Sequence, residues 1–178
     1  VILNKNNFTV TTIPLYHGIY TNGFLFRKKR TSHKLIVNKA IDLGIDKTQF
    51  AGIKLGKDGV TDKGQIIKNI KLVEPLSPDI VYAFCSDTLF NLKITEQIRE
   101  CDLLYHESTF LKKDENFAFK TFHSTAEQAA IIAKNSNVKK LILGHFSSRY
   151  NNLDLFINEA RTIFENCELA IENKSFVF

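Results

Sequence analysis

The sequence has no methionine and no tryptophan, and only three prolines and three cysteines among its 178 residues. No apolar run approaches the roughly 18 residues of a membrane-spanning helix, so we expect a protein without a helical membrane anchor. No basic segment precedes an apolar stretch in residues 1–10, which argues against a secretory signal. A chain that starts at Val1 without methionine has either lost its initiator residue or belongs to a longer protein, and both interpretations stay open.

The cysteines are too few and too scattered for a disulfide framework or a zinc knuckle. Cys85, Cys101 and Cys167 form no C-x-x-C pair and are odd in number. Buried free thiols in a reducing compartment are the simplest explanation, which predicts a cytoplasmic location.

Hydrophobic residues at 44% and charged residues at 24% are ordinary globular proportions, which excludes disordered and fibrous classes. The net charge of +5 is concentrated, because lysines crowd into residues 28–71. Such a stretch is typical of a solvated surface, and it also suits a polyanionic partner.

Apolar runs and breakers divide the chain into three segments. Residues 1–27 predict strands at 8–15 and 23–27. Residues 28–73 predict a turn-rich basic arm with one helix near 35–43, capped by Ser32. Residues 74–178 predict strands at 80–85, 103–105 and 138–143, and helices at 89–100, 126–134 and 153–164. Ser124 with Glu127 has the spacing of a capping box. Alternating strands and helices indicate an α/β or α+β domain.

Three apolar strands each run into a side chain that can bind a metal. Residues 8–15 lead to His17, residues 80–85 to Asp87, and residues 138–143 to His145. Strand ends share a rim in a layered domain, so these side chains could converge. Imidazole and carboxylate together suit zinc or another divalent metal. Taken singly, each histidine is more often structural, and Asp87 in "SDT" is also typical of a helix cap.

His123 precedes the expected start of a helix at Ser124. It would project from the positive end of that helix, where developing negative charge is favoured. The alternative is a loop histidine packed against Phe122.

Four motifs occur in order: "FCSDT", "LLYHESTF", "HSTAEQAAIIAK" and "LILGHFSSRY". Together with "PLYHGIYTNGFLFR" they resemble the C-terminal part of ribonuclease Z, the tRNA 3′-processing endonuclease of the metallo-β-lactamase superfamily. The resemblance covers essentially the whole chain. It implies an α+β fold, the C-terminal half of a four-layered αββα sandwich with an inserted lysine-rich arm. The arm departs from relatives that carry a Gly-Pro element there, since this chain has "KTQFAGIKLG".

The resemblance also implies roles for single residues. His17 becomes a ligand of one zinc ion, His145 a ligand of the other, and Asp87 the carboxylate that bridges both, with manganese as a possible substitute. His123 becomes the catalytic histidine that does not bind metal. The substrate-binding residues implied are Ser124, Thr125 and Arg149 near the site, and Lys54 and Lys57 on the arm.

The family's H-x-H-x-D-H motif is absent among the five histidines. We therefore expect the chain to be the C-terminal portion of a larger enzyme, with an active site that is incomplete on its own. The implied partners are precursor tRNA, the missing N-terminal part and, by family analogy, a second copy in a homodimer, with no membrane.

Two other functions compete with this interpretation. One is a metallo-β-lactamase-fold hydrolase of a small phosphodiester or ester, for which a second gripping surface would be superfluous. The other is a non-catalytic RNA-binding module that uses the arm alone. That alternative leaves the placement of His17, Asp87, His123 and His145 to chance.

Overall fold

The computed structural model describes residues 1–177. The chain forms two compact units, one made of Val1–Arg27 with Ile80–Phe178 and the other of Lys28–Asp79. The first unit holds a mixed sheet with helices, which confirms the α+β class predicted from the sequence.

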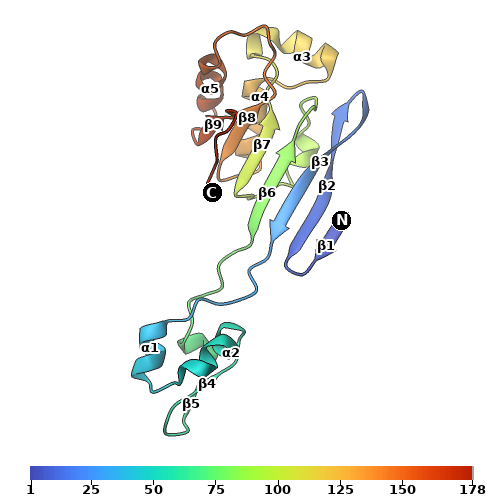
Figure 1. Cartoon of the computed structure of the whole chain (residues 1–178). Coiled ribbons are helices and arrows are strands. Elements are labelled where there is room, and N and C mark those ends of the chain that lie inside the picture. The colour runs from blue at the N-terminus through green and yellow to red at the C-terminus, as the bar shows by residue number, and fades with distance from the viewer. Residues whose placement is uncertain (178) are drawn as a thin grey trace. The chain divides into compact units, whose positions relative to one another are not determined.

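The sheet has seven strands in the described part of the chain, in the order β1-β2-β3-β6-β7-β8-β9 (Figure 1). β1 runs antiparallel to β2, whereas β6, β7, β8 and β9 are all parallel. Because they are parallel, the carboxyl ends of β6, β7 and β8 lie at one edge of the sheet. The strand bounds are Leu3–Lys5, Phe8–His17, Ile19–Lys28, Ile80–Cys85, Leu103–Glu107, Leu141–Gly144 and Cys167–Leu169.

Helices cover one face of this sheet. α4 (Ala126–Asn135) contacts β7, β8 and α5 (Asp154–Arg161), and α3 (Glu115–Thr121) precedes it. Ala129, Ala130 and Ala133 of α4 are fully buried in the main core, since their small side chains let the helix approach the strands closely. The core between sheet and helices therefore sits directly behind the strand ends.

The opposite face of the sheet carries a row of half-buried aromatic rings. Along β6, buried and half-buried residues alternate, as the two-residue period of a strand dictates. Phe26 stacks on Tyr82 with ring centroids 5.5 Å apart, and Phe84 stacks on Tyr105 at 4.7 Å. The described residues thus supply one helical layer and one sheet, with an apolar sheet face left half-exposed.

The second unit has a small core of its own rather than being only a turn-rich arm. Its buried residues are Leu35, Ala40, Ile45, Ile53, Leu72 and Val73. They come from α1 (Val37–Asp42), α2 (Phe50–Lys54), the β4–β5 hairpin (Gly59–Val60 and Ile66–Ile67), the short 3₁₀ turns Lys47–Gln49 and Asn69–Lys71, and adjoining segments. The unit extends beyond residue 73, the end expected from the sequence, because the Glu74 N–H donates to the Lys34 carbonyl at 2.8 Å.

Three local predictions were wrong. The helix expected at 89–100 is only a 3₁₀ turn, Leu92–Ile94, followed by further turns, because bonds such as Thr95 N–H to Leu92 carbonyl and Gln97 N–H to Ile94 carbonyl span three residues rather than four. Ser32 caps no helix, since α1 starts at Val37. The capping box is one residue later than expected and joins Thr125 to Gln128.

All three cysteines are buried free thiols. Between residues 1 and 177, no helix combines the length and the apolar character needed to cross a membrane.

Replacing Thr125 with Ala is expected to lower the free energy of unfolding by about 1 kcal/mol. The Gln128 N–H would lose its side-chain acceptor at the buried start of α4. Chemical denaturation measures the change. Glu127→Ala is the matched control, because it removes an acidic group of the first turn and its ion pair with Lys112 but leaves the cap, and it should change stability by less than about 1 kcal/mol. Equal losses in both variants would contradict the cap.

Candidate metal centre

The candidate site is built at the carboxyl edge of the parallel strands. Asp87 follows β6, Glu107 ends β7 and His145 follows β8. β2 ends at His17, and the chain beside it is fixed to the loop after β6, because the Leu89 N–H donates to the Tyr16 carbonyl at 2.7 Å. Adjacent strand ends therefore bring residues from distant parts of the sequence together.

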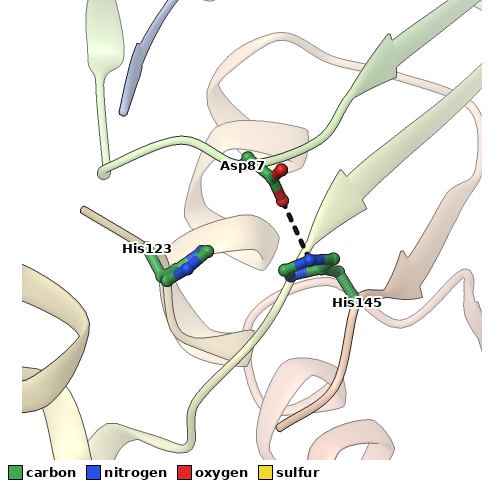
Figure 2. A group of neighbouring side chains, drawn as sticks. All are labelled: Asp87, His123 and His145. Atoms are coloured by element: carbon green, nitrogen blue, oxygen red, sulfur yellow. Dashed lines mark ion pairs between the residues drawn. The ribbon is translucent and has the colours of Figure 1, made fainter. Parts of the chain in front are cut away.

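Asp87, His123 and His145 converge within the described part of the chain (Figure 2). One ligand atom from each lies within 4.8 Å of the others. The Asp87 Oδ1 and His145 Nε2 atoms are 3.0 Å apart, and both side chains are about 40% exposed (39% and 42%). The group is thus open to solvent on one side, as a substrate-accessible metal site requires.

His145 is held from behind by Thr109. The Thr109 hydroxyl donates its single proton to Glu107 Oε2 at 2.6 Å, so it can only accept from His145 Nδ1, 2.9 Å away. Nδ1 of His145 therefore carries hydrogen, and Nε2 faces the Asp87 carboxylate. A cation between Nε2 and the carboxylate satisfies both.

His123 is held by Glu107. Its Nδ1–H donates to Glu107 Oε1 at 2.8 Å. This hydrogen bond raises the pKa of His123, against the opposing effect of burial. Burial alone would raise the pKa of Glu107, but the hydrogen bonds from His123 and Thr109 outweigh it and hold that pKa below its usual range. Glu107 is therefore a buried, charged carboxylate whose two oxygens both accept hydrogen bonds from the protein.

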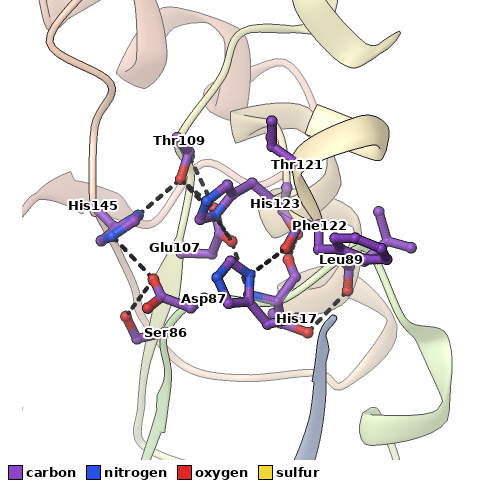
Figure 3. A network of polar contacts seen from close by, with 12 residues as sticks. His17, Ser86, Asp87, Leu89, Glu107, Thr109, Thr121, Phe122, His123 and His145 are labelled. Atoms are coloured by element: carbon purple, nitrogen blue, oxygen red, sulfur yellow. Dashed lines mark hydrogen bonds and ion pairs between the residues drawn. The ribbon is translucent and has the colours of Figure 1, made fainter. Parts of the chain in front are cut away.

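His17 is held by a backbone carbonyl. Its Nδ1 lies 2.9 Å from the Phe122 oxygen, which can only accept, so Nδ1 carries the hydrogen. The His17 ring lies beside His123 with centroids 4.7 Å apart (Figure 3). Among the described residues, however, His17 does not join the group of donors that converge within 4.8 Å.

The three histidines share one arrangement that fits a metal. Each has Nδ1 bonded to a protein acceptor, so these bonds leave Nε2 of each ring unused, and on His145 Nε2 lies 3.0 Å from the Asp87 carboxylate. Metal-binding histidines in proteins typically donate their second nitrogen in this way, because the bond fixes ring orientation and tautomer. The donor set of imidazoles and carboxylate suits a borderline divalent cation.

The backbone at the site is strained. Asp87, Phe122 and His145 all have positive φ angles, of 49°, 60° and 60°. Residues other than glycine adopt this left-handed conformation rarely, and such strain gathers at functional sites. The strained residues are thus two of the candidate ligands and the residue whose carbonyl holds His17.

Comparison with known proteins finds relatives along nearly the whole chain. Over 173 residues the chain is 42% identical to ribonuclease Z of Bacteroides thetaiotaomicron. This alignment covers 97% of this chain and 55% of the relative. The chain is a homologue of ribonuclease Z. Ribonuclease Z of Cytophaga hutchinsonii is 42% identical over 176 residues, covering 98% of this chain and 56% of the relative. The chain thus spans about half the length of the curated ribonuclease Z proteins it matches. No protein-family model matches it.

Solved structures show that the fold is the metallo-β-lactamase fold. A protein of that fold from Bacillus subtilis superposes with a TM-score of 0.60 at 16% identity, covering 94% of this chain and 48% of that one. The short form of human tRNase Z gives a TM-score of 0.52 at 20% identity, covering 95% and 42%.

The remaining residues expected at the site lie in different surroundings. Ser124 and Thr125 are fully buried, and their hydroxyl groups bond to the Thr88 carbonyl and the Gln128 N–H, so they shape the loop rather than face solvent. Arg149 is exposed, and its guanidinium lies 4.9 Å from the centroids of the Phe110 and Phe117 rings.

Lys54 and Lys57 are both exposed residues of the second unit. They belong to the second unit, whereas the metal-competent side chains belong to the first.

Glu107 and Thr109 are the site residues that the sequence interpretation missed. The apolar pattern predicts a strand over 103–105, whereas β7 continues to Glu107. The available signal was an acidic residue with hydroxyl neighbours at a strand end: Glu107 precedes Ser108 and Thr109, as Asp87 lies between Ser86 and Thr88.

Glu107→Ala is expected to lower the free energy of unfolding of the metal-free protein by about 3–5 kcal/mol. His123 Nδ1 and three further donors, the Thr88 N–H, the Thr109 N–H and the Thr109 hydroxyl, would lose their buried acceptor. Glu107→Gln keeps one acceptor oxygen and should lose less. Urea denaturation at neutral pH measures both.

The lowered pKa of Glu107 predicts an acid dependence of stability. Its contribution is complete above the unfolded value of about 4.3 and is lost as pH falls through the lower, folded value. Glu107→Gln should therefore flatten the acid side of the stability curve. An identical acid limb in both proteins would contradict the charged assignment.

Proposed function

We propose that the protein to which this chain belongs is an endoribonuclease that removes the 3′ trailer of precursor tRNA by metal-dependent phosphodiester hydrolysis. The observation that carries the proposal is the convergence of Asp87, His123 and His145 in a chain about 40% identical to ribonuclease Z along nearly all its length.

His17, Asp87 and His145 are the proposed metal-holding residues, with Asp87 shared between two ions. A carboxylate suits this position because its two oxygens can face two cations and its charge reduces their mutual repulsion. Zinc is the proposed metal, with manganese as an alternative. Bound divalent ions would neutralise charge on the phosphoryl oxygens and lower the pKa of water at the site.

Three side chains are too few for two ions. Catalytic zinc usually takes three protein ligands and a water, whereas each ion here would receive one histidine and a shared carboxylate. Further ligands therefore come from outside this chain. The half-exposed aromatic face around Phe26, Tyr82 and Phe84 supports the same proposal, because a second sheet of an αββα sandwich would cover it.

His123 is the proposed catalytic residue. A ligand histidine must be neutral, but the Glu107 carboxylate raises the pKa of His123 and so favours the protonated ring. The charged ring would donate from Nε2 to a phosphoryl oxygen or to the leaving oxygen, while Nδ1 stays on Glu107. The proton would thereby be held beside Asp87 and His145, since one ligand atom of each of these three residues lies within 4.8 Å of the others.

The substrate contacts proposed outside the chemistry are Arg149 and the lysines of the second unit. Arg149 is exposed and stacked on Phe110, whose ring centroid lies 6.2 Å from that of His123, so its charge is presented beside the site. Lys54 and Lys57 are exposed and would bind phosphates of the tRNA body.

The test is cleavage of a precursor tRNA by the full-length protein after metal removal and after return of zinc or manganese. Metal-dependent cleavage that leaves a 3′-hydroxyl on the tRNA body is expected. Equal or faster hydrolysis of a small phosphodiester would favour the small-substrate hydrolase. RNA binding without cleavage would favour the non-catalytic module.

His123→Ala is expected to lower kcat by about 10²-fold while the protein keeps its metal, because a positioned proton donor is removed without a ligand. His145→Ala, in contrast, should release metal. Cleavage assays and elemental analysis of the same preparations check both. Loss of metal from His123→Ala would reassign His123 as a ligand.

The double variant Lys54→Glu, Lys57→Glu is expected to raise KM for precursor tRNA and to spare a small phosphodiester. The salt dependence of tRNA binding should fall by about 0.7–0.9 in slope for each phosphate group that is no longer bound. Lys93→Glu, an exposed lysine of the sheet unit, is the charge control. Equal losses on both substrates would mean that Lys54 and Lys57 serve the fold instead.

A further inference from the structure

His17 differs from the other two histidines in what holds it. His123 and His145 bond to Glu107 and Thr109, side chains at the end of one strand. His17 bonds instead to the carbonyl of Phe122, which lies 105 positions away and directly precedes His123. The orientation of His17 therefore depends on the backbone of the loop that carries His123.

Phe122 adopts a conformation that a phenylalanine disfavours. It ends α3 in the left-handed region, with φ 60° and ψ 41°, and its N–H returns to the helix. Glycine is the usual residue there, because any Cβ crowds the backbone. Something beyond the helix end must hold this residue in place.

The Phe122 ring supplies that hold. It lies over Gly18, the residue after His17, so closely that a Cβ added at Gly18 would be 3.2 Å from two ring carbons. Tyr16, the residue before His17, meets the ring edge-on with centroids 5.9 Å apart. The ring thus packs on both neighbours of His17. The carbonyl of the same residue accepts from His17 itself (Figure 3).

We propose that Phe122 is a positioning residue for the metal site: its left-handed backbone, locked by the ring over Gly18, aims its carbonyl at His17 Nδ1 and turns Nε2 toward the metal. A single residue between α3 and α4 thereby fixes the ring orientation of His17 and lies directly before His123. This proposal rests on the proposed role of His17 as a metal ligand.

The proposal predicts that replacing Phe122 with alanine weakens metal binding more than replacing it with glycine. Both Phe122→Ala and Phe122→Gly remove the ring. Glycine populates the left-handed region freely, whereas alanine does not. Phe122→Gly should therefore keep the carbonyl on His17 more often than Phe122→Ala. A residue that acted only through ring packing would give equal losses.

The experiment measures zinc affinity of the full-length protein by competition with a chelator, and the visible spectrum of the Co²⁺-loaded protein. Phe122→Ala is expected to weaken metal binding by about 10–100-fold, the usual effect of losing the partner of a ligand histidine. Phe122→Gly should lose clearly less, and both Co²⁺ spectra should shift in the same order. Phe119→Ala, an exposed phenylalanine on the same helix, is the matched control and should match the wild type.

Each outcome decides the proposal. Wild-type affinity in Phe122→Ala, equal losses in the alanine and glycine variants, or an equal loss in Phe119→Ala would overturn it. If Phe122→Ala does not fold, the comparison of Phe122→Gly with Phe119→Ala and wild type decides, because a small loss confined to Phe122→Gly is expected. His17→Ala separates the two levels: unchanged metal binding in that variant means that His17 is no ligand, whereas metal loss there with a normal Phe122→Ala refutes only the positioning role.

Discussion

The arrangement of the site depends on one buried carboxylate. Glu107 is fully buried and accepts hydrogen bonds from three directions: the Thr88 N–H after β6, Thr109 after β7, and His123 before α4. Each donor belongs to a different loop, so the charge of one side chain joins all three. A buried charge with several short donors is stable only while every donor is present, which makes the loops mutually dependent.

The sheet provides the edge on which this carboxylate acts. Parallel pairing of β6, β7 and β8 puts Cys85, His106 and Leu143 in register, so the residues that follow leave the sheet at the same level. The chain must then turn sharply to aim Asp87 and His145 at each other, and both do so with positive φ. The strain at these turns is tolerated because the strands behind them are buried and paired. Since the strain itself lowers stability, the turns are explained by the placement of Asp87 and His145.

The sequence could predict the features that depend on neighbouring residues, but not those that depend on contacts between residues far apart in the chain. The meeting of Asp87 and His145 at one rim follows from apolar runs that end at polar residues, because strand ends depend mainly on local pattern, whereas His17 does not join their group within 4.8 Å among the described residues. Glu107 and Phe122 were missed as site residues because their importance lies in contacts with residues 16 to 105 positions away. The helix expected at 89–100 failed for a local reason, since periodic apolar residues such as Ile94 and Ile98 are buried equally well by successive turns. Burial of Ser124 and Thr125 likewise depends on packing that no motif encodes.

Exposure changes steadily across the site. The Glu107 side chain is fully buried, His123 is 15% exposed, and Asp87 and His145 are 39% and 42% exposed. The interior end carries the fixed charge, where low dielectric strengthens its bond to His123, and the outer end carries the groups that a metal and a phosphate must reach. His123 and His145 both hold Nδ1 on a protein acceptor, and Nε2 of His145 lies 3.0 Å from the half-exposed Asp87 carboxylate. Orientation is therefore set where water cannot compete, and binding occurs where the substrate can enter.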